Sequence, residues 1–275
     1  MMGYTVETLE KSRAKGFRPK KIFGLLLREF LGLKDNFKIL DLGCGTGFFT
    51  RIIAKETNAE ITGIDINQEL LKGANKISKE NSLNIKYEIG DITNIQYKDN
   101  TFDIVICDIM LECFNDISIP LREMKRVCKT GGKVVCIEPF YQSSIEYYEY
   151  TDKSTRNLIL KLARDGRDFG LGPMLPHFLN EVGLKSIDMI SWFWGGIEYK
   201  TLDLISIDDK LNDMRLNFNR IKKQISQVKD LSEEEGNKVI TFFQTRLNYF
   251  EKNPKKLYED MSVMGLPVFI VKGLK

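Results

Sequence analysis

The 275-residue sequence has a single histidine, and its five cysteines form none of the usual metal-binding or disulfide patterns. One histidine cannot build a histidine-based metal site, and no two cysteines stand in a Cys-x-x-Cys pair. The odd number of cysteines, scattered over apolar runs, gives no disulfide framework either. We therefore expect no bound metal and a reducing compartment, with four of the five as ordinary buried residues. The five are Cys44, Cys107, Cys113, Cys128 and Cys136.

Long apolar segments and an excess of one charge are also missing. No uninterrupted apolar run approaches the length of about 18 residues that a membrane span needs. The first residues, "MMGYTVETLEKSRAKG", lack the apolar centre of a signal peptide. The 41 basic and 38 acidic residues nearly balance, so bulk charge indicates no partner. We expect a soluble, cytoplasmic chain without membrane contact, and the sequence does not indicate its oligomeric state.

What the sequence does contain is a regular alternation of short apolar runs and helix-like stretches. This rhythm predicts crossover units and a parallel sheet that is buried on both faces. The strand-like runs are 37–42, 59–65, 84–89, 102–108 and 132–138, and the helix-like stretches are 48–56, 67–81 and 119–129. Asn67 is the expected N-cap of the second helix, and Thr130-Gly131-Gly132 is expected to end the third.

After residue 138 the alternation breaks, which predicts insertions into the core. A helix is expected at 173–183, a strand at 186–194 and a last strand at 266–273, whereas 200–260 has the pattern of amphipathic helices. The predicted parts are an N-terminal helical segment (1–36), a core (37–140), a first insertion (141–172), a core helix and strand (173–194), a helical cap (195–262) and the final core strand (263–275).

The segment "ILDLGCGTGFFT" at residues 39–50 is the strongest functional motif. A strand, a glycine-rich turn and a helix form a cradle in which the backbone comes close to a ligand. The dinucleotide fingerprint G-x-G-x-x-G fails because its third glycine is replaced by Phe48. The motif is G-x-G-x-G instead, with Asp41 two residues ahead of Gly43. A carboxylate at that point suits a cationic amine better than a phosphate.

Acids at the ends of the next two strands complete the predicted ligand site. Asp65 ends the second strand, where its two oxygens can accept hydrogen bonds from both ribose hydroxyls. Asp91 and Ile92 follow the third strand, where they can bond an exocyclic amine and pack against a purine. The ligand implied is an adenosine that carries a cationic amino group. The alternative interpretation of Asp65 and Asp91 is that they are solvated turn acids.

These motifs resemble those of the class I S-adenosylmethionine-dependent methyltransferases that act on small molecules. "GIDIN", "GDI", "FDIVICDIMLECFND" and "LREMKRVCKTGGKVVCIEPF" are similar to the later motifs of that family, in the same order. The resemblance implies a Rossmann-like α/β fold with helical cap insertions and a seven-stranded sheet of order 3-2-1-4-5-7-6, the last strand antiparallel. It also implies S-adenosylmethionine as cosubstrate, held by Asp41, Gly43, Cys44, Gly45, Gly47, Asp65, Ile66, Asp91, Ile92 and the backbone carbonyl of Cys107.

Methyl transfer from a sulfonium is an in-line displacement, so positioning and a dry pocket supply most of the catalysis. The acceptor should lie beyond the carboxyl ends of the fourth and fifth strands. Glu138 is the first candidate to touch it, followed by Tyr141 and His177, and Asp108 and Glu112 lie at the same edge.

A small-molecule acceptor is the preferred interpretation. The segment 200–260 carries 12 basic and 11 acidic residues, which is no phosphate-tracking stripe. The stretch "KSRAKGFRPKK" at 11–21, with six basic residues and no acid, could bind RNA or an anionic substrate, but a solvated N-terminal helix is the preferred interpretation. A protein that binds S-adenosylmethionine without turnover is the third hypothesis.

Overall fold

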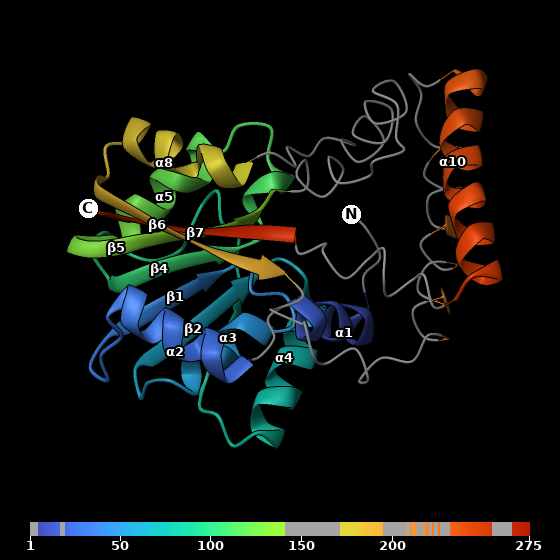
Figure 1. Cartoon of the computed structure of the whole chain (residues 1–275). Helices are drawn as coiled ribbons and strands as arrows, with labels where there is room; N and C mark the ends of the chain where they lie inside the picture. The colour runs from blue at the N-terminus through green and yellow to red at the C-terminus, as the bar shows by residue number, and fades with distance from the viewer. Residues whose placement is uncertain are drawn as a thin grey trace. The chain divides into compact units, whose positions relative to one another are not determined.

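A computed structural model describes residues 5–16, 20–140, 171–194, 232–254 and 266–275, with a few single residues between 208 and 225. The chain divides into two compact units (Figure 1). The first comprises residues 1–140, 170–196 and 266–275, and the second comprises 141–169 and 197–265. Nearly all of the predicted first insertion (141–172) and most of the predicted helical cap (195–262) lie outside the described residues.

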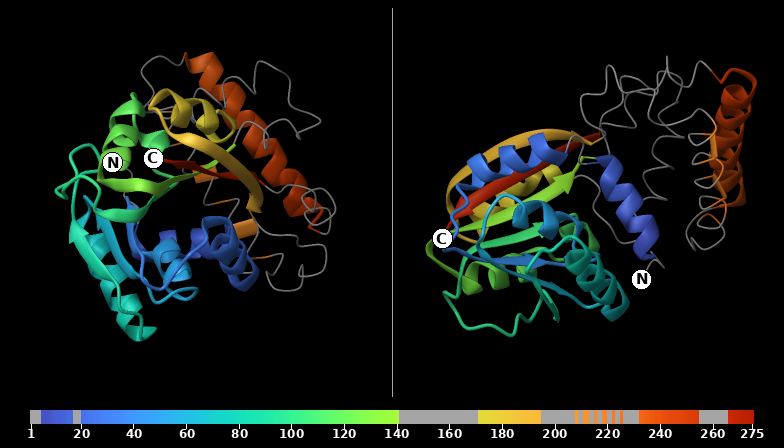
Figure 2. Two further views of the ribbon diagram at one scale, coloured as in Figure 1. Left: turned by 90° about the vertical axis from the view of Figure 1, so that its left-hand side faces the viewer. Right: turned by 90° about the horizontal axis from the view of Figure 1, so that it is seen from below.

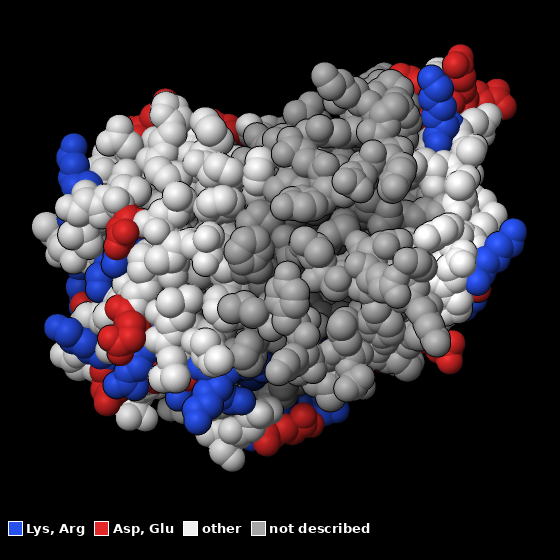
Figure 3. Space-filling model, viewed as in Figure 1, with Lys and Arg blue, Asp and Glu red and all other residues white. Residues whose placement is uncertain are grey.

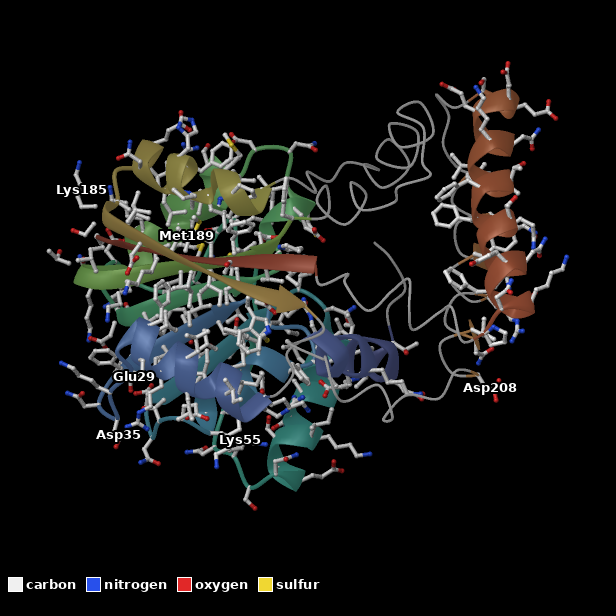
Figure 4. All side chains as sticks on the ribbon, viewed as in Figure 1. Glu29, Asp35, Lys55, Lys185, Met189 and Asp208 are labelled. Atoms are coloured by element: carbon white, nitrogen blue, oxygen red, sulfur yellow. The ribbon has the colours of Figure 1, made fainter. Side chains whose placement is uncertain are left out.

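The first unit is built on a seven-stranded sheet of order β3-β2-β1-β4-β5-β7-β6 (Figure 1). The strands are β1 (Lys38–Leu42), β2 (Glu60–Asp65), β3 (Lys86–Ile89), β4 (Phe102–Asp108), β5 (Cys128–Pro139), β6 (Lys185–Trp194) and β7 (Leu266–Leu274). Strands β1 to β5 pair in parallel, whereas β7 runs antiparallel to both β5 and β6. The predicted strand order and the antiparallel last strand are therefore confirmed. β6 forms one edge, on which Figure 4 labels Lys185 and Met189.

Helices cover both faces of this sheet, and the pleat of the strands decides which side chains meet them. The helices of the first unit are α1 (Val6–Gly16), α2 (Lys20–Leu31), α3 (Phe48–Ala54), α4 (Gln68–Glu80), the 3₁₀ turn η1 (Leu111–Cys113), α5 (Ser118–Val127) and α8 (Leu171–Glu181). Along β4, Val105 and Cys107 join a core that includes α5 and α8. Ile104 and Ile106 join the opposite core, with α2 and α3. Successive residues of a strand thus face different layers.

One predicted helix end is confirmed and another is wrong. The Asn67 side chain caps α4 by accepting hydrogen bonds from the backbone N–H groups of Glu69 and Leu70, as the sequence predicts. Helix α5, in contrast, ends at Val127, and Thr130-Gly131-Gly132 lies within β5. Glycine at 131 has a φ of 76°, and the pairing of β4 with β5 shifts register between Phe102 and Ile104. The glycines therefore permit a strand irregularity and do not end the helix.

In the second unit the longest described element is α10 (Glu233–Lys252), which begins with a capping box between Ser232 and Glu235. Its residues Val239, Leu247 and Phe250 are buried. Over the described part of the chain, no helix is long and apolar enough to cross a membrane.

Candidate cosubstrate site

The turn between β1 and α3 contains three glycines in the left-handed backbone region. Gly43, Gly45 and Gly47 have φ values of 66°, 53° and 71°. A Cβ atom at Gly43 would collide with the Met110 side chain, and one at Gly47 would collide with the Tyr87 hydroxyl. A Cβ atom at Gly45 would meet none of the described atoms within 4 Å. The described part of the chain therefore leaves open space at Gly45, as a loop that receives a ligand requires.

Asp65, at the end of β2, fixes the shape of this turn. One carboxylate oxygen accepts a hydrogen bond from the Gly45 backbone N–H (2.8 Å), and the other accepts one from the Asn67 N–H (2.8 Å). The side chain is buried at the predicted end of the strand. Both oxygens retain a second lone pair that could accept a ligand hydroxyl.

Asp41 is the next-to-last residue of β1 and Asp108 is the last residue of β4, and both lie on the face of the sheet that α3 covers. Asp41 is 1% exposed and accepts a hydrogen bond from the Thr50 hydroxyl of α3 at 2.5 Å. Burial raises the pKa of Asp41 to about 7, although the Thr50 hydroxyl opposes the rise. Burial also raises the pKa of Asp108, which Arg13 counteracts through an ion pair of 3.1 Å. The site therefore holds buried acids whose charge a cation stabilises.

Helix α1 lies against the glycine turn, beside the carboxyl ends of the parallel strands (Figure 2). Glu10 of α1 accepts hydrogen bonds from the Arg51 guanidinium (2.7 Å) and from the Thr46 hydroxyl (2.5 Å). Arg51 also donates to the Thr46 carbonyl at 2.6 Å. Neither Glu10 nor Arg51 was a predicted site residue, because their pairing joins positions 41 residues apart in the sequence.

A cavity of about 40 Å³ lies between α1 and the glycine turn. The described residues that line it are Leu9, Arg13, Asp41, Gly43, Cys44, Gly45, Thr46, Phe48, Phe49 and Asp108. Such a volume holds a few water molecules, whereas sites for cofactors and drug-sized ligands measure roughly 300–1,000 Å³. The cavity by itself therefore does not hold a whole nucleoside.

The predicted adenine residues differ in exposure. Asp91 is exposed, and one of its oxygens accepts hydrogen bonds from the Thr93 N–H (2.8 Å) and hydroxyl (2.7 Å), which lower its pKa. Ile92 is only 5% exposed and packs into the core, whereas Ile66 is 55% exposed. Of these two side chains, that of Ile66 is the one exposed at the surface.

Of the described candidates for the acceptor site, neither Glu138 nor His177 lines the cavity. Glu138 faces the opposite side of the sheet from Asp41, is 1% exposed, and accepts backbone hydrogen bonds from Met110 (3.0 Å) and Leu111 (2.7 Å). Burial raises the pKa of the Glu138 carboxyl well above its usual range, and the negative charge of Glu112 is the second cause of this rise. His177 lies on the exposed side of α8, 3.3 Å from Glu181, and does not line the cavity. Tyr141 lies outside the described residues.

Three further candidates from the sequence analysis are Cys107, Cys44 and Glu112. Cys107 is fully buried in β4, and its side chain faces the α5 and α8 layer, so only its backbone could meet a ligand at the strand ends. Cys44 lines the cavity, and burial raises the pKa of its thiol. Glu112 is buried in η1, at the edge of the sheet that Glu138 shares.

The basic N-terminal stretch is not one uniform solvated face. Arg13 turns inward to Asp108 with only 18% of its side chain exposed, and Lys20 lies 4.7 Å above the Phe48 ring. Lys11 is 71% exposed beside Glu7. On the face drawn in Figure 3, basic and acidic side chains are interspersed over the described surface.

The fold and the glycine turn with its acids together define a nucleotide-binding α/β protein, and comparisons with known proteins give its family. A family model described as a methyltransferase domain matches residues 33–164. The demethylmenaquinone methyltransferase of Bacillus subtilis is 31% identical over 184 residues, which cover 61% of this chain and 78% of that protein. The chain belongs to the class I S-adenosylmethionine-dependent methyltransferases. The demethylmenaquinone methyltransferase of Staphylococcus aureus is 34% identical over 127 residues, which cover 44% of this chain and about half (51%) of that relative.

Solved structures share the fold at low sequence identity. Phosphoethanolamine N-methyltransferase 2 of Haemonchus contortus, solved with phosphomonomethylethanolamine and S-adenosylhomocysteine, has a TM-score of 0.57 and 15% identity and covers all of this chain and 59% of its own. The [4+2]-cyclase SpnF has a TM-score of 0.56 and 18% identity, covering 93% of this chain and 80% of its own. Because one of these neighbours is named a cyclase, the fold alone does not establish methyl transfer.

Proposed function

We propose that this protein transfers a methyl group from S-adenosylmethionine to a small organic acceptor by in-line displacement. The observation that carries the proposal is the glycine turn, where Gly45 has a left-handed backbone, its N–H donates to Asp65, and a Cβ atom added to it would meet no described atom within 4 Å. The names of the relatives add support, since demethylmenaquinone methyltransferases act on a small quinone-type molecule.

In the proposed complex, the glycine turn and Asp41 surround the methionine part of the cosubstrate, and Cys107 contributes its carbonyl. Asp65 accepts hydrogen bonds from the ribose, while Asp91 bonds the adenine amine and Ile66 packs on its face. Ile92 supports this site from the core. The bound cosubstrate supplies a sulfonium-activated methyl group.

The protein itself contributes to the reaction by orienting the acceptor toward the methyl group and by excluding water. Leu9, Phe48 and Phe49 give the cavity apolar walls, which favour a step in which positive charge disperses. An acceptor held in line with the methyl group would gain most of its rate from positioning. Glu138 is proposed to act by holding the Met110–Leu111 backbone, because its described contacts are made there and not in the cavity.

The test is methyl transfer from radiolabelled S-adenosylmethionine to a panel of acceptors. The panel contains a naphthoquinol without its ring methyl, phosphoethanolamine, bulk tRNA and ribosomal RNA. We expect label in a small acceptor and none in RNA. Label in RNA would overturn the proposal, and S-adenosylhomocysteine binding without transfer to any acceptor would favour a non-catalytic binding protein.

Neutralising basic residues and changing the salt concentration both test whether the acceptor is a small molecule or RNA. A variant that neutralises Lys11, Lys15, Arg18 and Lys21 should keep its turnover, because a small acceptor does not need these charges. Arg13 and Lys20 stay in place, because they contact Asp108 and Phe48. Turnover should also change little between 50 and 200 mM salt, whereas about six phosphate contacts would lose roughly a thousandfold in affinity.

A further inference from the structure

The side chain of Trp192 carries a buried hydrogen-bond donor that is not paired. Trp192 lies near the end of β6, and the residue as a whole is partly exposed. Its indole Nε1 atom is nevertheless buried and has no hydrogen-bond partner among the described residues. Buried side-chain donors are nearly always paired in native proteins, because an unpaired donor gives up its bond to water without replacement. The Trp192 N–H is therefore a candidate for contact with a ligand.

Strand pairing places Trp192 at the edge of the sheet where the acceptor is expected. β6 is antiparallel to β7, and β7 is antiparallel to β5, so β6 runs in the same direction as β5. Trp192 pairs with Val268, which on its other side pairs with Pro139, the last residue of β5. Asp108, the last residue of β4, pairs with Ile137. Trp192 therefore lies at the carboxyl edge of the sheet.

The indole lies on the same face of the sheet as the cavity, against other aromatic rings. Trp192 packs on the core that contains α2 and α3. The centroid of its ring is 5.1 Å from that of Phe23, and the Phe23 centroid is 6.2 Å from that of Phe49. Phe49 lines the cavity, and β6 contacts α1 (Figure 1). A ligand at this edge would meet aromatic surfaces and one N–H donor.

An N–H donor among aromatic rings favours one kind of ligand. The indole N–H can only donate, so its partner must be an atom with a lone pair. The rings of Phe23 and Trp192 are flat and apolar, which favours an aromatic partner in offset or edge-to-face contact. A charged group would lose its hydration against these rings, and a single neutral N–H would not replace that hydration. The best complement is an aromatic ring that carries a carbonyl or hydroxyl oxygen.

We propose that Trp192 is a specificity-determining residue, whose indole N–H donates a hydrogen bond to a ring carbonyl or hydroxyl oxygen of an aromatic methyl acceptor. The acceptor then extends from the carboxyl ends of β4 and β5 toward β6. This inference rests on the proposed methyl transfer to a small acceptor, and it names the chemical class of that acceptor. Trp192 binds and orients the acceptor, and it exchanges no proton or methyl group with it.

Calorimetric titration with two matched ligands tests the inference. 2,3-Dimethyl-1,4-naphthoquinone carries two ring carbonyls, and 2,3-dimethylnaphthalene has the same carbon skeleton without them. Each is titrated into protein saturated with S-adenosylhomocysteine. Trp192→Phe keeps an aromatic ring and removes the N–H. It should weaken binding of the quinone by about 3- to 10-fold, the range expected for one neutral hydrogen bond, and change binding of the hydrocarbon by less than about twofold.

Ser191→Ala is the matched control, because it removes a hydrogen-bond donor from the adjacent, exposed position of β6, on the other face of the strand. It should leave both affinities unchanged. Trp194→Phe gives a second measurement that keeps the Trp192 side chain, because the sequence has two tryptophans and this variant retains Trp192 alone. The quinone should quench the remaining fluorescence over the same concentration range in which it binds by calorimetry.

Four results would overturn the inference. Unchanged quinone affinity in Trp192→Phe, or an equal loss for both ligands, would show that the N–H does not bond the acceptor. Fluorescence of Trp192 that the bound quinone does not quench would place the ligand elsewhere, and this measurement decides if Trp192→Phe does not fold. If wild-type protein binds neither ligand, the acceptor is of another class. Methyl transfer to phosphoethanolamine would then leave the proposed function intact, so the two failures are distinguishable.

Discussion

The free energy of unfolding should fall as pH rises because of one buried carboxyl, Asp41. Burial raises its pKa from 3.8 to about 7. Between these values the folded chain keeps a proton that the unfolded chain releases. The folded state therefore binds more protons, and its stability falls as pH rises from about 4 to about 7 and then stays at the lower level.

The size of this fall follows from the difference between the two pKa values. Each pH unit within the window is worth about 1.4 kcal/mol, so the whole contribution is about 4 kcal/mol. Asp41→Asn removes the titration, and the amide oxygen can still accept the hydrogen bond of the Thr50 hydroxyl. We expect Asp41→Asn to be more stable than wild type above pH 7, by up to about 4 kcal/mol, with a difference that shrinks toward pH 4.

The assay is urea unfolding followed by circular dichroism at pH 5, 6, 7 and 8. Asp108 and Glu138 also have raised pKa values, but they contribute to both proteins, so the difference between the two curves isolates Asp41. Asp35→Asn is a control of opposite sign. Hydrogen bonding to the Asn58 N–H lowers the pKa of Asp35, so its contribution is present at neutral pH and lost on acidification.

Parallel curves for wild type and Asp41→Asn from pH 5 to 8 would refute this reasoning. They would mean that Asp41 is ionised in the folded chain throughout that range. The same substitution should weaken S-adenosylhomocysteine binding, because the proposed site uses the negative charge of Asp41 toward the ligand's amine. A gain in stability with a loss of affinity is the expected signature.

Four further substitutions test the turn, a matched glycine in β5 and the buried Glu138. Gly47→Ala should lower the free energy of unfolding in urea by roughly 2–5 kcal/mol, because the cost of a positive φ adds to that of a collision with Tyr87. Gly131 has a similar φ but open space around it, so Gly131→Ala should lower the free energy of unfolding by only about 1–2 kcal/mol. Asp65→Ala should weaken S-adenosylhomocysteine binding about a hundredfold by calorimetry, and unchanged affinity would contradict the ribose assignment. Glu138→Gln should keep both affinity and turnover near wild type at neutral pH, since the amide oxygen still accepts the two backbone hydrogen bonds; a selective loss of turnover would instead show contact with the acceptor.

Much of the fold could be predicted because the strands are buried on both faces. The runs at 59–65 and 102–108 read as strands from their apolar character alone, and glycines of positive φ occupy the turn where the motif places them. Capping by Asn67 was also predictable, because a side chain that bonds N–H groups two and three residues on is a local interaction.

What could not be predicted depends on contacts between distant positions. The ion pair of Arg13 with Asp108 joins α1 to β4, and no local pattern in "KSRAKGFRPKK" indicates which basic residue turns inward. The side of the sheet on which Glu138 lies depends on the pleat of β5. Ile137 faces the α2 and α3 layer, so Glu138 faces the α5 and α8 layer, as Cys136 does. Thr130-Gly131-Gly132 fits a helix end and a strand irregularity equally well until the pairing with β4 is known.

The position of β7 in the sheet has a consequence for synthesis of the protein. β7 lies between β5 and β6, yet its residues Leu266–Leu274 follow β5 by more than a hundred positions. At about 5–20 residues per second, a ribosome needs on the order of 10 s to make the intervening chain. During that interval the outer backbone groups of β5 have no strand partner, so the nascent chain presents an edge that another chain can pair with.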